Sequence, residues 1–319
     1  MKGKKLVIFM MGVLLCTKLF AQSGSFVSIP LNARSVSMGN TYIAQENSNA
    51  VFTNMAASSV SNKSFEVNLN YRPWLNELSN DYSLSSISSY FAIDNKNSIA
   101  LGFKNYSMPN YLKTDMDGND AGTYTPNEFA LALGYGYRIS DKSAVSLSIQ
   151  YLGADLGDNA KANTIFVDLG YKSSYKQLEY GVTIKNLGPE LKFDNSSSSL
   201  PLTIGAGVAY SEKVSQKHTI MASMDFAHMS LNDEAGFSSG IGLQYIYNDL
   251  FSLRSGYHFM DDTIGLSTFT LGTGLQIKSF AVDFSYLLSD NILKNNFNFT
   301  CSFKLNKIPR KYVHLSSEK

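Results

Sequence analysis

The feature that most limits the possible fold is an alternation of apolar and polar side chains that recurs along the chain. Residues 145–151, 280–286 and 297–305 each place an apolar, mostly aliphatic or aromatic, side chain at every second position. This period is typical of a β-strand with one apolar and one polar face. The alternating segments run for about 10 to 14 residues, whereas strands average about five or six and a tilted strand that crosses a bilayer needs about 9 to 11. The pattern favours a transmembrane β-barrel over a soluble β-sandwich, which also alternates.

Composition supports a sheet with one apolar face and one uncharged polar face. The chain contains 19 tyrosines and 20 phenylalanines, but only 17% of its residues are charged. Aromatic side chains gather near the ends of the alternating segments, as in the aromatic girdles of outer-membrane barrels. The formal net charge is +1, so no basic surface for nucleic acid is expected.

The connections between the expected strands alternate between short and long. The strands are expected at 64–74, 82–93, 97–107, 126–139, 142–155, 161–175, 177–187, 200–211, 216–229, 236–248, 249–260, 267–278, 279–289 and 295–305. Outer-membrane barrels have short periplasmic turns and longer extracellular loops. The first connection, 75–81, is a long one, as a strand rising from a periplasmic N-terminus requires. The sequence therefore predicts an all-β, antiparallel outer-membrane β-barrel of about fourteen strands.

The N-terminus has the pattern of a secretory signal peptide. Three lysines within the first five residues precede an apolar core at 6–15, and Ala21 offers a small residue at the cleavage point. The apolar core is too short for a membrane-spanning helix, which needs about 20 residues. Cys16 follows the bulky Leu15, which disfavours lipoprotein processing. We expect export, and only Cys301 remains in the mature chain, so no intrachain disulfide is expected.

Four segments follow from these patterns. Residues 1–21 are the expected signal peptide, and residues 64–305 form the expected barrel. Residues 22–63 precede the first strand and are expected to form a short helical or irregular plug in the barrel lumen. Residues 306–319 carry several basic side chains and alternate weakly. They are expected to form a periplasmic tail.

The order of several short motifs resembles the PorV/PorQ family of the Bacteroidota type IX secretion system, within the FadL-like barrel superfamily. Residues 32–39 are similar to the family's "ARs-x-x-MG" start. Residues 48–56 match its "NA-x-[YF]-x-N-P-A" segment, with Met55 in place of the usual proline. Residues 71–75 and 126–130 resemble the PorV branch in particular. The resemblance extends over nearly the whole mature chain, and it implies a barrel with an N-terminal plug.

The resemblance also implies a non-enzymatic role in secretion. Members of the PorV branch bind the conserved C-terminal β-sandwich signal of secreted cargo and sit against the lateral opening of the giant translocon barrel. They then pass cargo to the cell-surface attachment complex. The expected partners are therefore the translocon, cargo signal domains, the attachment complex and outer-membrane lipid. No cofactor is expected.

Apolar side chains in the expected extracellular loops are the candidate partner-binding residues, because apolar surface that faces water often marks a contact site. They are Trp74, Leu75, Met108, Tyr111, Leu112, Leu191 and Phe193. The alternative is that these side chains fold inward over the barrel mouth. An edge strand for the addition of a cargo strand is not expected, because a closed barrel has no free edge.

Two alternative functions remain open. A FadL-type transporter of hydrophobic small molecules would need an apolar lumen. The alternation instead points a set of polar side chains inward, namely Glu66, Asn68, Ser146, Ser148, Gln150, Asp283 and Lys304. An outer-membrane lipid deacylase could use His228 and Ser230 as base and nucleophile, but the sequence shows no third group to orient them.

Other motifs favour ordinary structural explanations. Residues 236–240 fit G-x-S-x-G but lack the strand–turn–helix context of a nucleophile elbow. Residues 115–120 are acidic, yet the spacing differs from an EF-hand and suits a turn. The histidines are scattered. No catalytic residue and no metal site is therefore expected.

Overall fold

The computed structural model describes residues 23–306, apart from residues 47, 116, 158–159, 195, 233 and 290–291. The expected signal peptide, and the expected tail beyond residue 306, lie outside the described residues. In the described part, no helix is long and apolar enough to cross a membrane.

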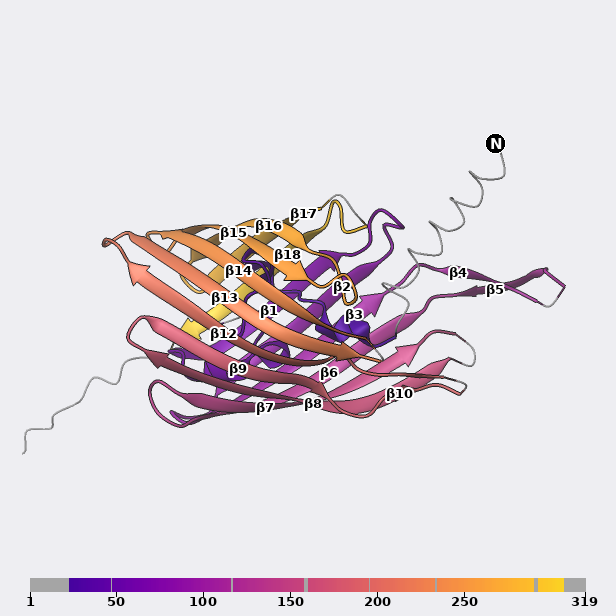
Figure 1. The fold of residues 1–319 in the computed structure, drawn as a ribbon, viewed down its shortest axis with the longest axis horizontal. Coiled ribbons are helices and arrows are strands. Elements are labelled where there is room, and N and C mark those ends of the chain that lie inside the picture. Colours follow the sequence, from indigo (N-terminus) through magenta and orange to yellow (C-terminus); the bar gives the residue numbers. More distant parts are fainter. Residues whose placement is uncertain are drawn as a thin grey trace, which may run out of the picture.

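Fourteen antiparallel strands form a closed barrel, as predicted (Figure 1). They are β1 (Lys63–Pro73), β2 (Ser83–Ala92), β3 (Asn97–Ser107), β6 (Asn127–Arg138), β7 (Ala144–Asp155), β8 (Lys161–Tyr175), β9 (Leu178–Leu187), β12 (Leu202–Lys213), β13 (His218–Leu231), β14 (Glu234–Tyr247), β15 (Phe251–Met260), β16 (Thr268–Ile277), β17 (Phe280–Leu288) and β18 (Phe297–Asn306). The first and last strands close the barrel, with Leu69 opposite Cys301. Each strand begins and ends within two residues of its expected range.

The alternation sorts side chains between the two faces of the wall. In β6, Leu131, Leu133 and Tyr135 are exposed, while Ala130 and Ala132 between them are buried. The other barrel strands repeat this pattern, so large apolar side chains cover the outside of the barrel. That distribution suits a wall in contact with lipid.

The connections gather at two ends of the barrel. One end, here called the short-turn end, carries tight turns such as Asn248–Asp249, where both residues have a positive φ of 54°. Asn and Asp tolerate that conformation in tight hairpin turns. The other, the long-loop end, carries the long connections. The expected long connection at 230–235 is wrong, because β13 and β14 remain paired as far as Leu231 opposite Glu234.

Two small hairpins occur in segments expected to be loops. The first is β4 (Tyr111–Thr114) with β5 (Asp120–Tyr124), and the second is β10 (Leu191–Lys192) with β11 (Ser197–Ser198). Figure 1 shows that β4 and β5 project well beyond the barrel at the long-loop end. We call residues 108–126 the arm.

The residues before β1 fill the lumen as a plug of short helices. They are η1 (Ser25–Ser28), α2 (Ala33–Ser37), η2 (Ala50–Phe52) and α3 (Met55–Ser59). Asn32 and Asn54 cap α2 and α3 by accepting hydrogen bonds from the N–H groups of Ser35 and Ala56. Met55 takes the first helical position of α3, where proline is common but not required. The helix therefore forms without the usual proline.

Glycines in the wall let the plug approach closely. A Cβ atom at Gly240 would lie 2.1 Å from the Gly39 oxygen, and one at Gly242 would lie 2.4 Å from the Met38 oxygen. At Gly256 it would lie 2.2 Å from the Gly39 nitrogen. Only glycine permits such backbone contact. The plug is thus packed directly against β14 and β15.

Candidate partner-binding face and lumen

The long-loop end is closed by an apolar cluster, which we call the mouth cluster. Its largest members are Phe26, Leu31, Trp74, Leu75, Leu84, Leu152, Phe166, Leu191, Leu200 and Leu293. Trp74 lies over the guanidinium of Arg72, 4.4 Å from ring centroid to Cζ. Residues from the plug, the wall and three loops therefore meet in one core that seals the mouth.

The structure divides the seven candidate contact residues into two groups. Trp74, Leu75 and Leu191 are buried in the mouth cluster, and Phe193 packs against it. This is the inward arrangement weighed above as the alternative. Three candidates belong to the arm: Met108 at its base is partly buried, Tyr111 is 39% exposed and Leu112 is 74% exposed. The candidates that remain exposed therefore lie on the arm.

The arm is a hairpin with its own stabilising contacts. Tyr111 lies opposite Tyr124 in the hairpin, with the ring centroids 5.8 Å apart. The hydroxyl groups of Tyr82 and Tyr111 are 2.8 Å apart and link the arm to the preceding loop. Partial burial and this hydrogen bond raise the pKa of Tyr82 to about 12, so its phenol is protonated at neutral pH. The arm is a structured extension rather than an irregular loop.

Within the described residues, β4 and β5 pair only with each other. Each strand thus leaves one edge without a backbone partner, and such edges accept strands from other chains. The expectation that no free edge exists holds for the barrel wall but not for the whole protein. Sequence reasoning missed the hairpin because its strands are 4 and 5 residues long.

The acidic tip of the arm is a turn held by Asp115. Its carboxylate accepts hydrogen bonds from the N–H groups of Asp117 and Asn119, at 2.9 and 2.8 Å. The Asn119 side-chain amide also donates to the carboxylate at 3.1 Å, and this bond, followed by the backbone bonds, lowers the pKa of Asp115. Asp and Asn commonly stabilise turns in this way, which agrees with the structural explanation of this acidic segment.

Two buried charges hold the start of the plug under the mouth cluster. The ammonium group of Lys104 donates to the carbonyl oxygens of Phe26, Val27 and Ile29 at 2.8, 3.0 and 2.8 Å. The carboxylate of Glu128 accepts from the Gly24 N–H at 3.2 Å. Sequence reasoning did not single out either charge, although both stand at inward positions of their strands.

The lumen contains the polar side chains that the alternation predicted. Glu66, Asn68, Ser148, Gln150 and Asp283 are buried inside the barrel. The other two also face inward: the Ser146 hydroxyl accepts from the Ala56 N–H at 3.0 Å, and Lys304 reaches the plug residue Glu46 at 2.7 Å. Polar contacts therefore join the plug to the wall in this part of the lumen.

One region of the lumen is more apolar than expected. A cavity of about 220 Å³ lies between the plug and the long loops. Its apolar lining includes Met229, Leu231, Met260, Ile264, Leu266, Leu287 and Leu293. Arg72, Lys185 and His258 contribute polar groups to the same cavity. We call it the upper cavity.

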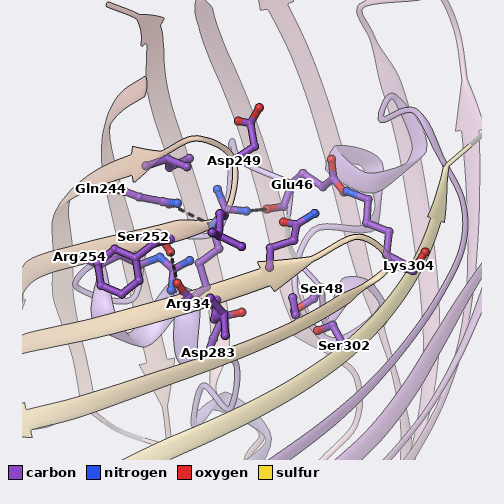
Figure 2. A pocket seen from close by; sticks show the side chains of 18 of the residues that line it. Arg34, Glu46, Ser48, Gln244, Asp249, Ser252, Arg254, Asp283, Ser302 and Lys304 are labelled. Carbon is purple, nitrogen blue, oxygen red and sulfur yellow. Dashed lines mark hydrogen bonds and ion pairs between the residues drawn. The ribbon is translucent and has the colours of Figure 1, made fainter. Parts of the chain in front are cut away.

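A second cavity, the lower cavity, measures about 150 Å³ and is lined partly by the turn residues Asp249, Leu250 and Ser279 at the short-turn end. Figure 2 shows charged side chains from the plug and the wall meeting in it. Glu46 pairs with Lys304 at 2.7 Å and with Lys63 at 3.6 Å. Burial alone would raise the pKa of Glu46, but Lys63, Lys304 and Arg34 outweigh it and lower the pKa to about 2.

The Glu46 ion pairs predict a pH-dependent contribution to stability. A carboxyl whose pKa falls on folding stabilises the fold above its unfolded pKa and loses that effect as the pH drops through the folded value. The loss should run from about pH 4.5 to about pH 2. We expect Glu46→Gln to lower the urea midpoint at pH 6 but much less at pH 3. The matched change Glu190→Gln, in an exposed loop, should alter the urea midpoint at neither pH. If Glu46→Gln lowered the midpoint equally at pH 6 and pH 3, the stabilising role of the Glu46 ion pairs would be contradicted.

The other motifs weighed above have no catalytic partner among the described residues that face them on the neighbouring strands. His228 is exposed on the outer face of β13, with its ring centroid 4.8 Å from that of Phe237. The residues opposite His228 and Ser230 on the neighbouring strands are Ile204, Phe237, Leu202 and Ala235. None of these can orient a base. Ser238 of the G-x-S-x-G match lies within β14, not at a strand–helix elbow.

The plugged barrel with a lipid-facing apolar wall has the fold of FadL-like outer-membrane barrels. The toluene transporter TodX from P. putida has a similar structure, with a TM-score of 0.62 at 14% identity over 86% of this chain and 98% of that chain. The toluene transporter TbuX from Ralstonia pickettii gives 0.59 at 12% over 87% and 98%. A Pseudomonas aeruginosa FadL homologue gives 0.55 at 10% over 87% and 99%. At these identities the likeness shows the fold alone.

The sequence identifies the family within that class. The family model for "Type IX secretion system protein PorV" matches residues 17–234, more than half of the chain. The chain therefore belongs to the PorV family and is an outer-membrane component of the type IX secretion system. No curated protein sequence matches it.

Proposed function

We propose that the protein binds the C-terminal signal domain of secreted cargo and passes it from the translocon to the surface attachment machinery. The observation that carries this proposal is the arm, a projecting hairpin with an exposed Leu112 and two edges that pair with no other described strand. The signal domain expected in the cargo is a β-sandwich, whose edge strands can extend such a hairpin. Strand addition supplies main-chain hydrogen bonds, and nearby apolar side chains supply specificity.

The lumen supports a role at the surface rather than as a polypeptide channel. The plug and the mouth cluster fill it, and the two cavities described measure about 220 and 150 Å³. A cavity of that size holds a small molecule at most. Cargo would therefore contact the outside of the protein.

The direction of the barrel fits the same role. Short turns face the periplasm and long loops face outward in outer-membrane barrels. With that orientation the arm extends outside the cell, where cargo emerges from the giant translocon barrel. The lipid-facing wall leaves room for a second barrel alongside, and the arm can then deliver cargo to the attachment complex.

Affinity purification of the tagged protein from its own cells, in detergent, tests the proposal. We expect co-purification of a very large barrel and of secreted proteins that share a C-terminal β-sandwich. Deletion of the gene should leave cargo in the periplasm or unattached at the surface. Normal display of cargo in the deletion strain would refute the shuttle role.

The upper cavity favours a second candidate function, the passage of small hydrophobic molecules. Its apolar lining and its place beneath the mouth would suit a ligand such as toluene, which two structurally similar proteins are named for transporting. We expect any toluene binding to be abolished by Ala227→Phe, which would fill part of the cavity that Ala227 lines. The lipid-facing control Ala206→Phe should bind as the wild type does. Absence of toluene binding in the wild type would remove this candidate.

A further inference from the structure

Two guanidinium groups from different parts of the chain share the lower cavity. Arg34 comes from α2 in the plug and Arg254 comes from β15 in the wall, and Figure 2 shows both in the same cavity. Asp283 pairs with Arg254 at 2.6 Å. In the described part of the chain, no carboxylate lies within ion-pair distance of Arg34.

The hydrogen bonds of Arg34 go to neutral groups. Its Nε donates to the Gln244 side-chain oxygen at 3.2 Å, and Nη1 donates to the Glu46 carbonyl oxygen at 3.3 Å. Among the described residues, Nη2 reaches only the sulfur of Met221, at 3.6 Å, and a thioether is a weak acceptor. None of these bonds joins Arg34 to a carboxylate, so the cation makes no direct ion pair with a described residue.

Among the described residues, the other carboxylates of the cavity make no ion pair with Arg34, although its charge acts on Glu46 at longer range. Glu46 is engaged by Lys304 and Lys63, and Glu66 by Lys63. Asp249 is exposed in its turn at the short-turn end. The corner formed by Arg34, Arg254 and Asp283 thus carries two positive charges and one negative charge.

Unsatisfied polar atoms in the lining point to a missing partner. The Nε of Arg254 is buried and has no hydrogen-bond partner among the described residues, and the same holds for the Ser302 hydroxyl. Both residues line the lower cavity. Arg254 is 8% exposed, so solvent outside the barrel cannot easily satisfy its Nε. Buried polar groups without a partner usually indicate an absent water or ion.

We propose that the lower cavity binds a small oxyanion, a carboxylate or phosphate group, between Arg34 and Arg254. Guanidinium groups match the geometry of both oxyanions. The turn residues in the lining place the entrance at the short-turn end, so the ligand enters from the periplasm. By contacting α2 and β15 together, the anion ties the plug to the wall. This inference does not depend on the cargo-binding role.

Binding of inorganic phosphate and of acetate to the purified, folded protein in a non-ionic detergent tests the proposal. Each is titrated by calorimetry against sodium chloride of equal ionic strength. We expect saturable binding of at least one of the two anions, with thermal stabilisation beyond that from chloride. Preference for phosphate or for acetate then distinguishes a tetrahedral from a planar ligand.

Arg34→Gln should weaken that binding by at least about tenfold, because one of the two cationic groups is lost. Arg138→Gln is the matched control: Arg138 also ties the plug to the wall, through the Ser59 and Ser61 carbonyl oxygens at 2.9 and 2.7 Å, but outside this cavity. It should bind the anion as the wild type does. Arg254→Lys keeps a charge for Asp283 but loses Nε, and should also weaken binding.

Heat-modifiable migration on gels shows whether each variant is folded. Failure of the wild type to bind either anion saturably would overturn the proposal. So would equal binding by the wild type and a folded Arg34→Gln variant.

Discussion

Leucine in place of Gly256 should displace the plug from its position against the barrel wall. A Cβ atom at this position would lie 2.2 Å from the Gly39 nitrogen and 2.3 Å from the Met38 carbonyl carbon. Both are backbone atoms, and Gly39 itself has a φ of +68° that other residues rarely adopt. The clash cannot be relieved by turning a side chain. The contacts of α2 with the wall should be lost, at a cost of several kcal/mol typical of severe overpacking.

Limited trypsin digestion of the purified barrel measures this effect. Arg34 lies in α2, within the barrel, and should resist cleavage in the wild type but become accessible in Gly256→Leu. Ser255→Leu is the matched control, because Ser255 is the neighbouring residue on the outer face of β15, opposite Leu243 and Leu271. It should retain the wild-type digestion pattern and heat-modifiable migration. A folded Gly256→Leu barrel with Arg34 still protected would show that the plug can shift to accept the side chain.

The wall of the barrel was predictable because one physical rule governs every strand. A strand between lipid and a polar lumen must alternate, so residues such as Ile149 and Gln150 reveal their faces from the sequence alone. A plug over residues 22–63 was expected in the lumen, but its contacts with the wall did not follow from such a rule. Its position depends on contacts between distant residues, such as the Tyr42 and Ile43 N–H groups with the Asp225 carboxylate at 2.7 and 2.9 Å. No local pattern in the sequence predicts contacts between residues so far apart.

The candidate contact face was predictable only in part, for a related reason. Apolar residues in loops were found from the sequence, but composition does not say which way a loop folds. Trp74 and Leu191 became core residues of the mouth cluster because other loops and the plug cover them. Leu112 stayed exposed because its hairpin leaves the barrel. The lower cavity was not predicted from the sequence. Arg34 and Arg254 are far apart in the sequence and come together only when the plug occupies the lumen.

Replacing the arm with a short turn should abolish cargo binding and leave the barrel intact. Ser107 at the end of β3 lies directly opposite Asn127 at the start of β6. An Asn-Gly pair in place of residues 108–126 can therefore close this hairpin as a tight turn. If cargo strands add to β4 or β5, the cargo recovered with the protein should fall at least about tenfold, which corresponds to about 1.4 kcal/mol of binding free energy.

A second loop provides a control of the same design. Asp155 and Lys161 are also directly opposite each other, so an Asn-Gly pair can replace residues 156–160. That variant shortens the long-loop end without touching the arm and should bind cargo normally.

Leu112→Asp separates the two sources of affinity: it removes an apolar side chain but leaves the backbone edges available. If the arm replacement loses cargo and Leu112→Asp retains it, the backbone edges supply most of the binding free energy. Normal cargo recovery after arm replacement would exclude the arm as the binding element and would favour the lipid-facing wall instead.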